Sequence, residues 1–172
     1  MLTIAFLFSL VVHLFQGVLF PGITLLAFAP FFALCCMKTT LKSTLWLAAI
    51  AGFCVDILSN DPMGLHALNY TTILVLLYSL RWRFSSEESL HLGLYTILIS
   101  SISTLLQLVL LFLFDRRVPV SGTWIWVDLI CMPLLDGLYA LIFFSAPLLL
   151  WRQLRYQWLI YRLRTKKKRR SA

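Results

Sequence analysis

Residues 52–68 read Gly52-Phe53-Cys54-Val55-Asp56-Ile57-Leu58-Ser59-Asn60-Asp61-Pro62-Met63-Gly64-Leu65-His66-Ala67-Leu68. The first part predicts the end of an apolar helix with one carboxylate, Asp56, a single turn before its last residues. The centre, from Ser59 to Pro62, is made of residues that favour turns. A second apolar helix is predicted to begin at Gly64. A polar turn this short between two apolar helices predicts the tip of a helical hairpin.

The composition of the whole chain is typical of a membrane protein. The 172 residues are 60% hydrophobic and 13% charged, whereas a soluble domain carries about 25% charged residues. The mean hydropathy is +0.88. We therefore expect an all-α membrane protein with one transmembrane domain over residues 1–151 and no soluble domain of useful size. Its function would be carried out in the bilayer, at the faces of the bilayer, or through partners.

Apolar segments separated by turn signals and charges predict a bundle of six transmembrane helices. The second and third are shorter than the about 17 to 25 residues of a typical span, so we expect neighbours or a thinned bilayer to shield them. The last is too long to be straight, and its prolines predict kinks. The expected bounds are Leu2–Phe20, Ile23–Met37 (with Pro30 inside), Ser43–Leu58, Gly64–Leu80, Leu90–Phe114 and Thr123–Trp151 (with Pro133 and Pro147 inside).

The positive charges set the expected orientation, because cytoplasmic loops carry the excess of Lys and Arg. With the N-terminus inside, the outer loops hold two basic residues, both in the segment 115–122. The inner segments hold the whole C-terminal tail and four loop residues, which are Lys38, Lys42, Arg81 and Arg83. We therefore expect both termini in the cytoplasm and the turn at 59–62 outside.

A basic tail follows the last predicted helix at residues 152–172. Next to a membrane, each basic residue near the surface attracts anionic lipid by about 1 kcal/mol. Contact with a cytoplasmic partner is the alternative, and nucleic acid, which mixed basic and aromatic residues can also bind, is not expected. The residues predicted to bind lipid are Arg162, Arg164, Lys166, Lys167, Lys168, Arg169 and Arg170.

Three acids fall within or near the predicted spans, and such residues usually face protein or water. Asp56 lies close to the outer tip and Asp128 near the outer start of the last helix. Asp136 is deeper and is followed by Gly137. A hydrogen bond between helices is the interpretation we favour for these acids. A ligand or proton site is the alternative.

Two stripes of small and polar residues predict close helix packing, because their spacing of three and four residues puts each stripe on one helix face. The first stripe comprises Ser9, His13, Gln16 and Gly17, and the second comprises Ser100, Ser103, Thr104 and Gln107.

No pattern in the chain predicts a catalytic or metal site. The sequence has neither a nucleophile elbow nor a phosphate-binding loop. The three histidines fall on different segments without ligand spacing, so we expect no metal, no cofactor and no enzymatic activity. The four cysteines lie in apolar segments and are expected to be small buried hydrophobic residues rather than disulfides; they are Cys35, Cys36, Cys54 and Cys131.

The hairpin resembles that of the MreD family of rod shape-determining proteins. In that family the third helix ends in a Gly…Asp-x-x-Ser pattern, and a short tip leads to a Gly-Leu pair that opens the fourth. Here the pattern is Gly52…Asp56-Ile57-Leu58-Ser59, followed by 60–63 and Gly64-Leu65. The chain length, the expected helix number and the basic end match as well. So does the pair of a polar residue and Gly in the last helix, which is Asp136-Gly137 here, whereas relatives can carry Asn in place of the Asp.

This resemblance implies a fold related to the substrate-binding subunits of energy-coupling-factor transporters. It implies a non-catalytic component of the bacterial cell-elongation complex in the inner membrane, which scaffolds or regulates peptidoglycan synthesis and cell shape. The implied partners are MreC-like, MreB-like, RodA-like and transpeptidase proteins. The fold relation also supplies the alternative, a vitamin-binding transporter subunit, although the predicted outer loops are short for such a pocket.

Seven residues are the candidates for contact with a partner or a small ligand. We expect the hairpin residues to shape the turn and to meet a partner, with ligand binding beneath the tip as the alternative. The candidates are Asp56, Ser59, Asp61, Pro62, Gly64, Asp128 and Asp136.

Overall fold

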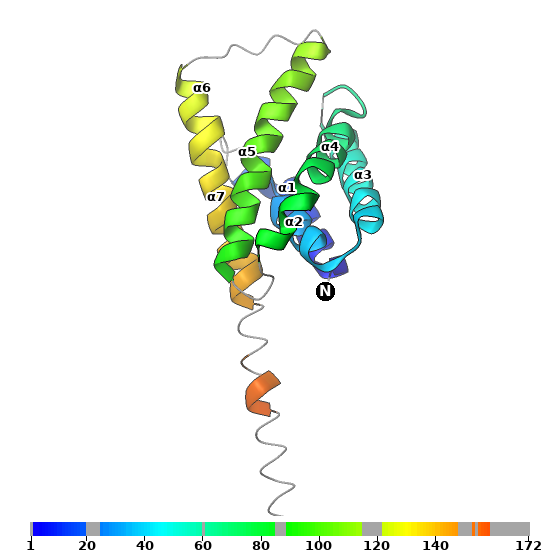
Figure 1. The fold of residues 1–172 in the computed structure, drawn as a ribbon. Helices are drawn as coiled ribbons and strands as arrows, with labels where there is room; N and C mark the ends of the chain where they lie inside the picture. Colours follow the sequence, from blue (N-terminus) through cyan, green and yellow to red (C-terminus); the bar gives the residue numbers. More distant parts are fainter. Residues whose placement is uncertain are drawn as a thin grey trace, which may run out of the picture.

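A computed structural model describes residues 2–19, 25–59, 61–84, 89–114, 122–147, 153 and 155–158. Within these residues the protein is helical and contains no strand (Figure 1). The main elements are α1 (Leu2–Leu19), α2 (Ala29–Lys38), α3 (Leu41–Leu58), α4 (Leu65–Tyr78), the 3₁₀ helix η1 (Ser79–Arg83), α5 (Ser89–Leu113), α6 (Gly122–Trp126), the π-helical stretch η2 (Val127–Cys131), α7 (Met132–Tyr139) and the π-helical stretch η3 (Ala140–Ser145).

Three of the described helices are long and apolar enough to cross a membrane, so the chain is a membrane protein. They are Leu41–Leu58, Leu90–Leu113 and Val127–Ser145. Two further apolar helices, Leu2–Val18 and Ala29–Lys38, are shorter, and α4 has 14 residues. Length and composition therefore identify three spans, and the count of six stays a prediction.

The second helix begins later than its hydropathy predicts. The expected start at Ile23 is wrong for residues 25–28, which precede the helix, and 20–24 lie outside the described residues. Helix α2 begins at Ala29, so Pro30 falls in its first turn. Proline is tolerated there because the first N–H groups of a helix have no partner within the helix. Hydropathy alone could not locate this start, since the residues before it are equally apolar.

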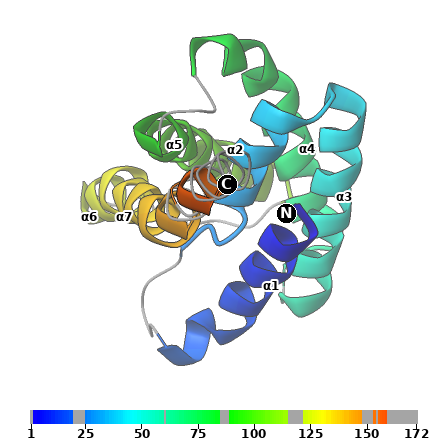
Figure 2. The ribbon, with the colours of Figure 1, turned by 90° about the horizontal axis from the view of Figure 1, so that it is seen from below.

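Helix α2 forms the centre of the molecule. Its residues 29–36 are all buried, and it lies against α1, α3, α4, α5 and α7. Figure 2 shows α2 in the middle of the end view, with α1 running obliquely across the picture and α5 seen nearly end on. A helix enclosed on all sides does not need the length of a membrane span, which explains how a segment of 10 residues is accommodated.

Aromatic rings join α2 to two of its neighbours. The ring of Phe6 on α1 lies 5.8 Å from that of Phe28 and 5.5 Å from that of Phe31. On the other side, the rings of Phe32 and Tyr70 are 4.9 Å apart. These centroid distances and the tilted or edge-on angles are the favourable ones for aromatic pairs. The core is thus built around the first turns of α2.

The last helix is continuous over residues 122–147 and contains two π-helical stretches. The first, η2, ends just before Pro133, which lies in the first turn of α7. Prolines and π-helical turns both interrupt the regular helix ladder. A widened turn therefore precedes Pro133, and the kink expected there stays a prediction.

The cysteines are free thiols, as expected, but they are not all buried. Cys35 and Cys36 are buried in α2, whereas Cys54 is partly exposed and Cys131 is exposed. The prediction of burial is wrong for Cys131, because an apolar residue in a membrane helix can face the lipid as readily as the protein.

Candidate functional site

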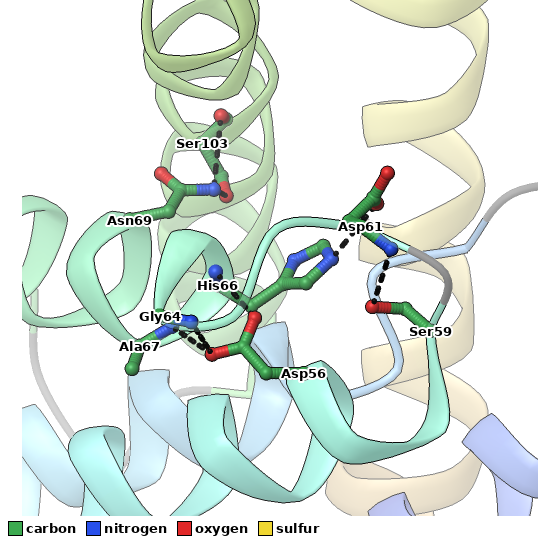
Figure 3. Close-up of polar contacts among 8 residues, drawn as sticks. All are labelled: Asp56, Ser59, Asp61, Gly64, His66, Ala67, Asn69 and Ser103. Carbon is green, nitrogen blue, oxygen red and sulfur yellow. Dashed lines mark hydrogen bonds and ion pairs between the residues drawn. The ribbon is translucent and has the colours of Figure 1, made fainter. Parts of the chain in front are cut away.

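Asp56 fastens the end of α3 to the start of α4. Its carboxylate accepts N–H groups from Gly64 at 3.0 Å and Ala67 at 3.3 Å on Oδ2, and from His66 at 2.9 Å on Oδ1 (Figure 3). These donors are N-terminal groups of a helix, which have no partner within the helix itself. The negative charge also lies at the positive end of the α4 dipole. Since Asp56 is 2% exposed, it acts as a buried helix cap supplied by another helix.

Gly64 is the residue that lets the chain enter α4. Its φ of 90° lies in the left-handed region, which side chains with a Cβ avoid. A Cβ added at Gly64 would meet nothing within 4 Å, so the requirement is one of backbone conformation. The predicted helix start at Gly64 is one residue early, because Gly64 precedes the first helical residue, Leu65.

Gly52 lets α3 and α4 approach backbone to backbone. A Cβ at this position would lie 2.2 Å from the Cα of Ala67, which is far inside van der Waals contact. Ala48 and Ala51 are also fully buried on α3. Small residues are the usual means of close approach between membrane helices, so the hairpin is a tightly packed unit below its tip.

The tip itself is held by weaker polar contacts. The N–H of Asp61 donates to Ser59 Oγ at 3.4 Å, and the N–H of Leu65 donates to the carbonyl oxygen of Pro62 at 3.1 Å. The Asp61 carboxylate lies 3.3 Å from Nε2 of His66, and 38% of the Asp61 side chain is exposed. Unlike Asp56, therefore, Asp61 presents part of its carboxylate outward.

Asn69 links the hairpin to α5. Its Nδ2 donates to Ser103 Oγ at 3.0 Å, and Asn69 is completely buried (Figure 3). The predicted polar stripe on the fifth helix thus does face protein at this position. Because Asn69 is one helical turn after His66, the two polar side chains lie on neighbouring positions of α4.

Asp136 joins three distant parts of the chain. It accepts the N–H of Leu26, in the segment before α2, at 3.0 Å, and it accepts the hydroxyl of Ser100 from α5. Asp136 is 1% exposed. The Leu26 N–H would otherwise have no helical partner, and backbone of this kind is tolerated in a membrane protein where other groups satisfy it. These contacts agree with our interpretation of Asp136 as a residue that bonds between helices.

Gly137, next to Asp136, allows α7 to approach α5. A Cβ there would lie 2.4 Å from Cγ1 of Ile97 and 3.4 Å from the carbonyl oxygen of Gly93. The closest atom thus belongs to a side chain rather than to backbone. The Asp136-Gly137 pair therefore combines a hydrogen bond with a close contact, as Asp56 and Gly52 do in the hairpin.

The remaining candidate residues lie neither in the hairpin nor at the contact between α5 and α7. Asp128 is partly exposed on η2, and the structure gives it no hydrogen bond with any described residue. The lipid-binding residues predicted in the tail, from Arg162 to Arg170, lie outside the described residues. The seven candidates thus divide into the hairpin group, Asp136 at the centre, and Asp128 apart.

Two buried atoms of the hairpin have no hydrogen-bond partner among the described residues. They are Nδ1 of His66 and Oδ1 of Asn69. Buried polar atoms are normally satisfied, so each marks a place where water or a ligand would be favoured. Both side chains belong to α4 close below the tip. Within the described part of the chain, no group of His, Cys, Asp and Glu could hold a metal ion.

Sequence reasoning missed the part played by His66, Asn69 and Leu26. Asn69 carried a usable signal, since an amide in an apolar helix needs a partner. The cap formed by Asp56 also had a signal, because a carboxylate shortly before a helix start favours its N–H groups. Leu26 carried no signal in the sequence, because its backbone N–H and not its side chain makes the hydrogen bond to Asp136.

Comparison of the chain with protein-family models, with curated proteins and with solved structures found no match.

Proposed function

We propose that this protein is a non-catalytic component of the bacterial cell-elongation complex. It would lie in the inner membrane and scaffold or regulate peptidoglycan synthesis, and thereby cell shape. The observation that carries the proposal is the hairpin. Three residues of the MreD-like pattern have a defined structural role, with Gly52 at the helix crossing, Asp56 at the cap and Gly64 at the left-handed turn.

The chemistry of the hairpin favours a scaffold over an enzyme. Three N–H groups of the same chain occupy the Asp56 carboxylate, so it is not free to act on a substrate. Among the described residues of the tip, Met63 is 76% exposed and Asp61 is partly exposed. An exposed methionine suits contact with another protein, because Met is enriched at protein interfaces. MreC-like, MreB-like, RodA-like and transpeptidase proteins are the proposed partners.

The proposed arrangement has both termini in the cytoplasm and the tip outside. It is supported by the positive charges and by the contacts of Arg81, which donates to the carbonyl oxygen of Thr39 at 3.3 Å. The basic loop residues around Lys38 and Arg81 thus gather at one end of the bundle. Single cysteines at positions 61 and 168, in a cysteine-free background, test this with an impermeant thiol reagent on spheroplasts. Labelling at 168 without labelling at 61 would overturn the orientation.

The test of the scaffold is recovery of partners with the tagged protein in mild detergent. Met63→Glu should lower recovery of the elongation proteins and impair cell shape, because it places charge on the proposed contact. Leu90→Glu is the matched control, since Leu90 is 67% exposed on α5, away from the tip. If wild-type protein recovers none of these partners, or an ATPase module with its coupling subunit instead, the proposal fails.

A vitamin-binding transporter subunit is the second candidate, and one observation favours it. His66 Nδ1 and Asn69 Oδ1 are buried beneath the tip without a partner among the described residues, as expected of a small polar ligand site. Native mass spectrometry of the purified protein should then detect a bound small molecule. The double variant His66→Phe, Asn69→Leu should remove that molecule while Met63→Glu keeps it.

A further inference from the structure

A groove at the basic end of the bundle is separate from the hairpin and from Asp136. It lies between α1 and η3, has a volume of about 430 Å³, and its lining is almost wholly apolar. Leu34 and Phe144 are 8% and 6% exposed, whereas Ile4 and Phe143 are 70% and 53% exposed. The groove therefore has a buried floor and open sides, as expected of a cavity that faces the bilayer.

Phe8 marks the point where α1 and η3 meet. Its ring lies 5.7 Å from that of Phe143 and 5.7 Å from that of Phe144. The other lining residues of α1, including Ala5, precede Phe8 in the chain, and Pro147 follows η3. The groove is thus bounded by an aromatic contact and extends from it along the two chain segments.

Lys38 gives the groove one charged position. It is the last residue of α2 and lines the groove, while every other lining residue is apolar. Lys38 forms no ion pair with any residue in the described ranges. A long apolar surface with one cation suits a ligand that has an apolar chain and an anionic head.

We propose that this groove binds one acyl chain of an anionic phospholipid, with Lys38 at the lipid phosphate. Cavities of about 300 to 1,000 Å³ are typical of small-molecule sites, so the groove is large enough for an ordered chain. The charge of Lys38 complements the lipid phosphate, and the apolar lining complements the acyl chain.

A second groove provides matched controls. It is lined by Lys42, Trp46, Ala49 and residues of α4, and its volume is about 520 Å³. It also has one lysine, but Thr71 and Thr72 contribute to its lining. Changes at Lys42 and Ala49 thus repeat the same alterations of charge and volume elsewhere on the surface.

The experiment measures lipid retained by the full chain in native mass spectrometry, with phosphatidylglycerol and phosphatidylcholine as probes. Wild-type protein should retain one phosphatidylglycerol in preference to phosphatidylcholine. Lys38→Gln should weaken phosphatidylglycerol binding about fivefold, which corresponds to about 1 kcal/mol for one cation. Ala5→Trp should remove binding of both lipids by filling the groove. Lys42→Gln and Ala49→Trp should bind as wild type does.

Equal losses in the Lys38 and Lys42 variants would overturn the proposal, since they would indicate general attraction by charge. Equal retention of both lipids by wild-type protein would also overturn it. So would an Ala5→Trp variant that keeps the lipid but loses a partner protein, because the groove would then be a protein interface. Should Ala5→Trp fail to fold, phosphatidylglycerol with short chains must bind wild-type protein more weakly than the long-chain form.

Discussion

The α3–α4 hairpin and the α5–α7 pair solve the same packing problem with the same two residue types. Each contains a buried aspartate that accepts hydrogen bonds from another segment, Asp56 in the hairpin and Asp136 in α7. Each also has a glycine where the two helices approach, Gly52 in the hairpin and Gly137 in α7. In both places a small residue brings two helices together and a carboxylate fixes them.

The two regions differ in what the aspartate and the glycine contact. Asp56 accepts three backbone N–H groups, whereas Asp136 accepts one backbone N–H and one hydroxyl. The Cβ of a residue at Gly52 would strike backbone, and one at Gly137 would first strike the side chain of Ile97. Backbone cannot move aside as a side chain can, so the hairpin should tolerate substitution less well than the α5–α7 pair.

The largest effect is expected at Gly52. Gly52→Val should destabilise the protein by more than about 3 kcal/mol, because the new side chain overlaps the backbone of α4. Thermal unfolding in detergent, followed by size-exclusion chromatography, measures the loss. Gly17→Val is the control, since a Cβ at Gly17 meets nothing within 4 Å. Equal stability of the two variants would contradict the close approach of α3 and α4.

The next comparison sets Asp56→Asn against Asp136→Asn. An Asn amide nitrogen donates and cannot accept the N–H groups that Asp56 receives on both oxygens, so we expect a loss of about 3 kcal/mol. At Asp136 one oxygen faces a hydroxyl, which can reverse its role and accept from the amide. The loss there should be about 1 kcal/mol or less. Chemical denaturation of both variants gives the ranking, and the reverse order would refute it.

An effect between those of Asp56→Asn and Asp136→Asn is expected at Gly137. Gly137→Ala should cost about 2 kcal/mol, because Ile97 must change its rotamer or shift. The double variant Gly137→Ala, Ile97→Ala should recover part of this stability, since the obstructing atoms are then absent. Measured coupling between the two positions checks the contact. If the losses simply add, Ile97 is not the obstacle.

A small effect, similar to that of Asp136→Asn, is expected at Gly64. Gly64→Ala should cost about 1 kcal/mol, which is the usual strain of a left-handed conformation. Gly64→Asn should cost less, because Asn adopts this conformation more readily. Hydrogen exchange of the first N–H groups of α4 reports the strain locally. Equal protection in the Ala variant and the wild type would show that the left-handed conformation at position 64 causes no strain.

Much of the hairpin could be predicted from the sequence. The end of α3 at Leu58 and the start of α4 within one residue of Gly64 follow from neighbouring residues. The start of α2 could not be predicted, because hydropathy does not distinguish helix from buried non-helical backbone. The hydrogen-bond partners of Asp136 could not be predicted either, although the sequence does predict that Asp136 forms a hydrogen bond between helices.

The sequence by itself determined the helical membrane class, the position of the hairpin and the separation of polar tip from apolar body. These depend on composition and on residues within about one helical turn of each other. Only the tertiary structure decided that Asp136 meets Leu26, which is 110 positions away, and that α2 is enclosed by the other helices. The physical reason is that a buried carboxylate accepts hydrogen bonds from the donors that helix packing places next to it. That packing depends on all the helices together and not on residues near Asp136 in the sequence.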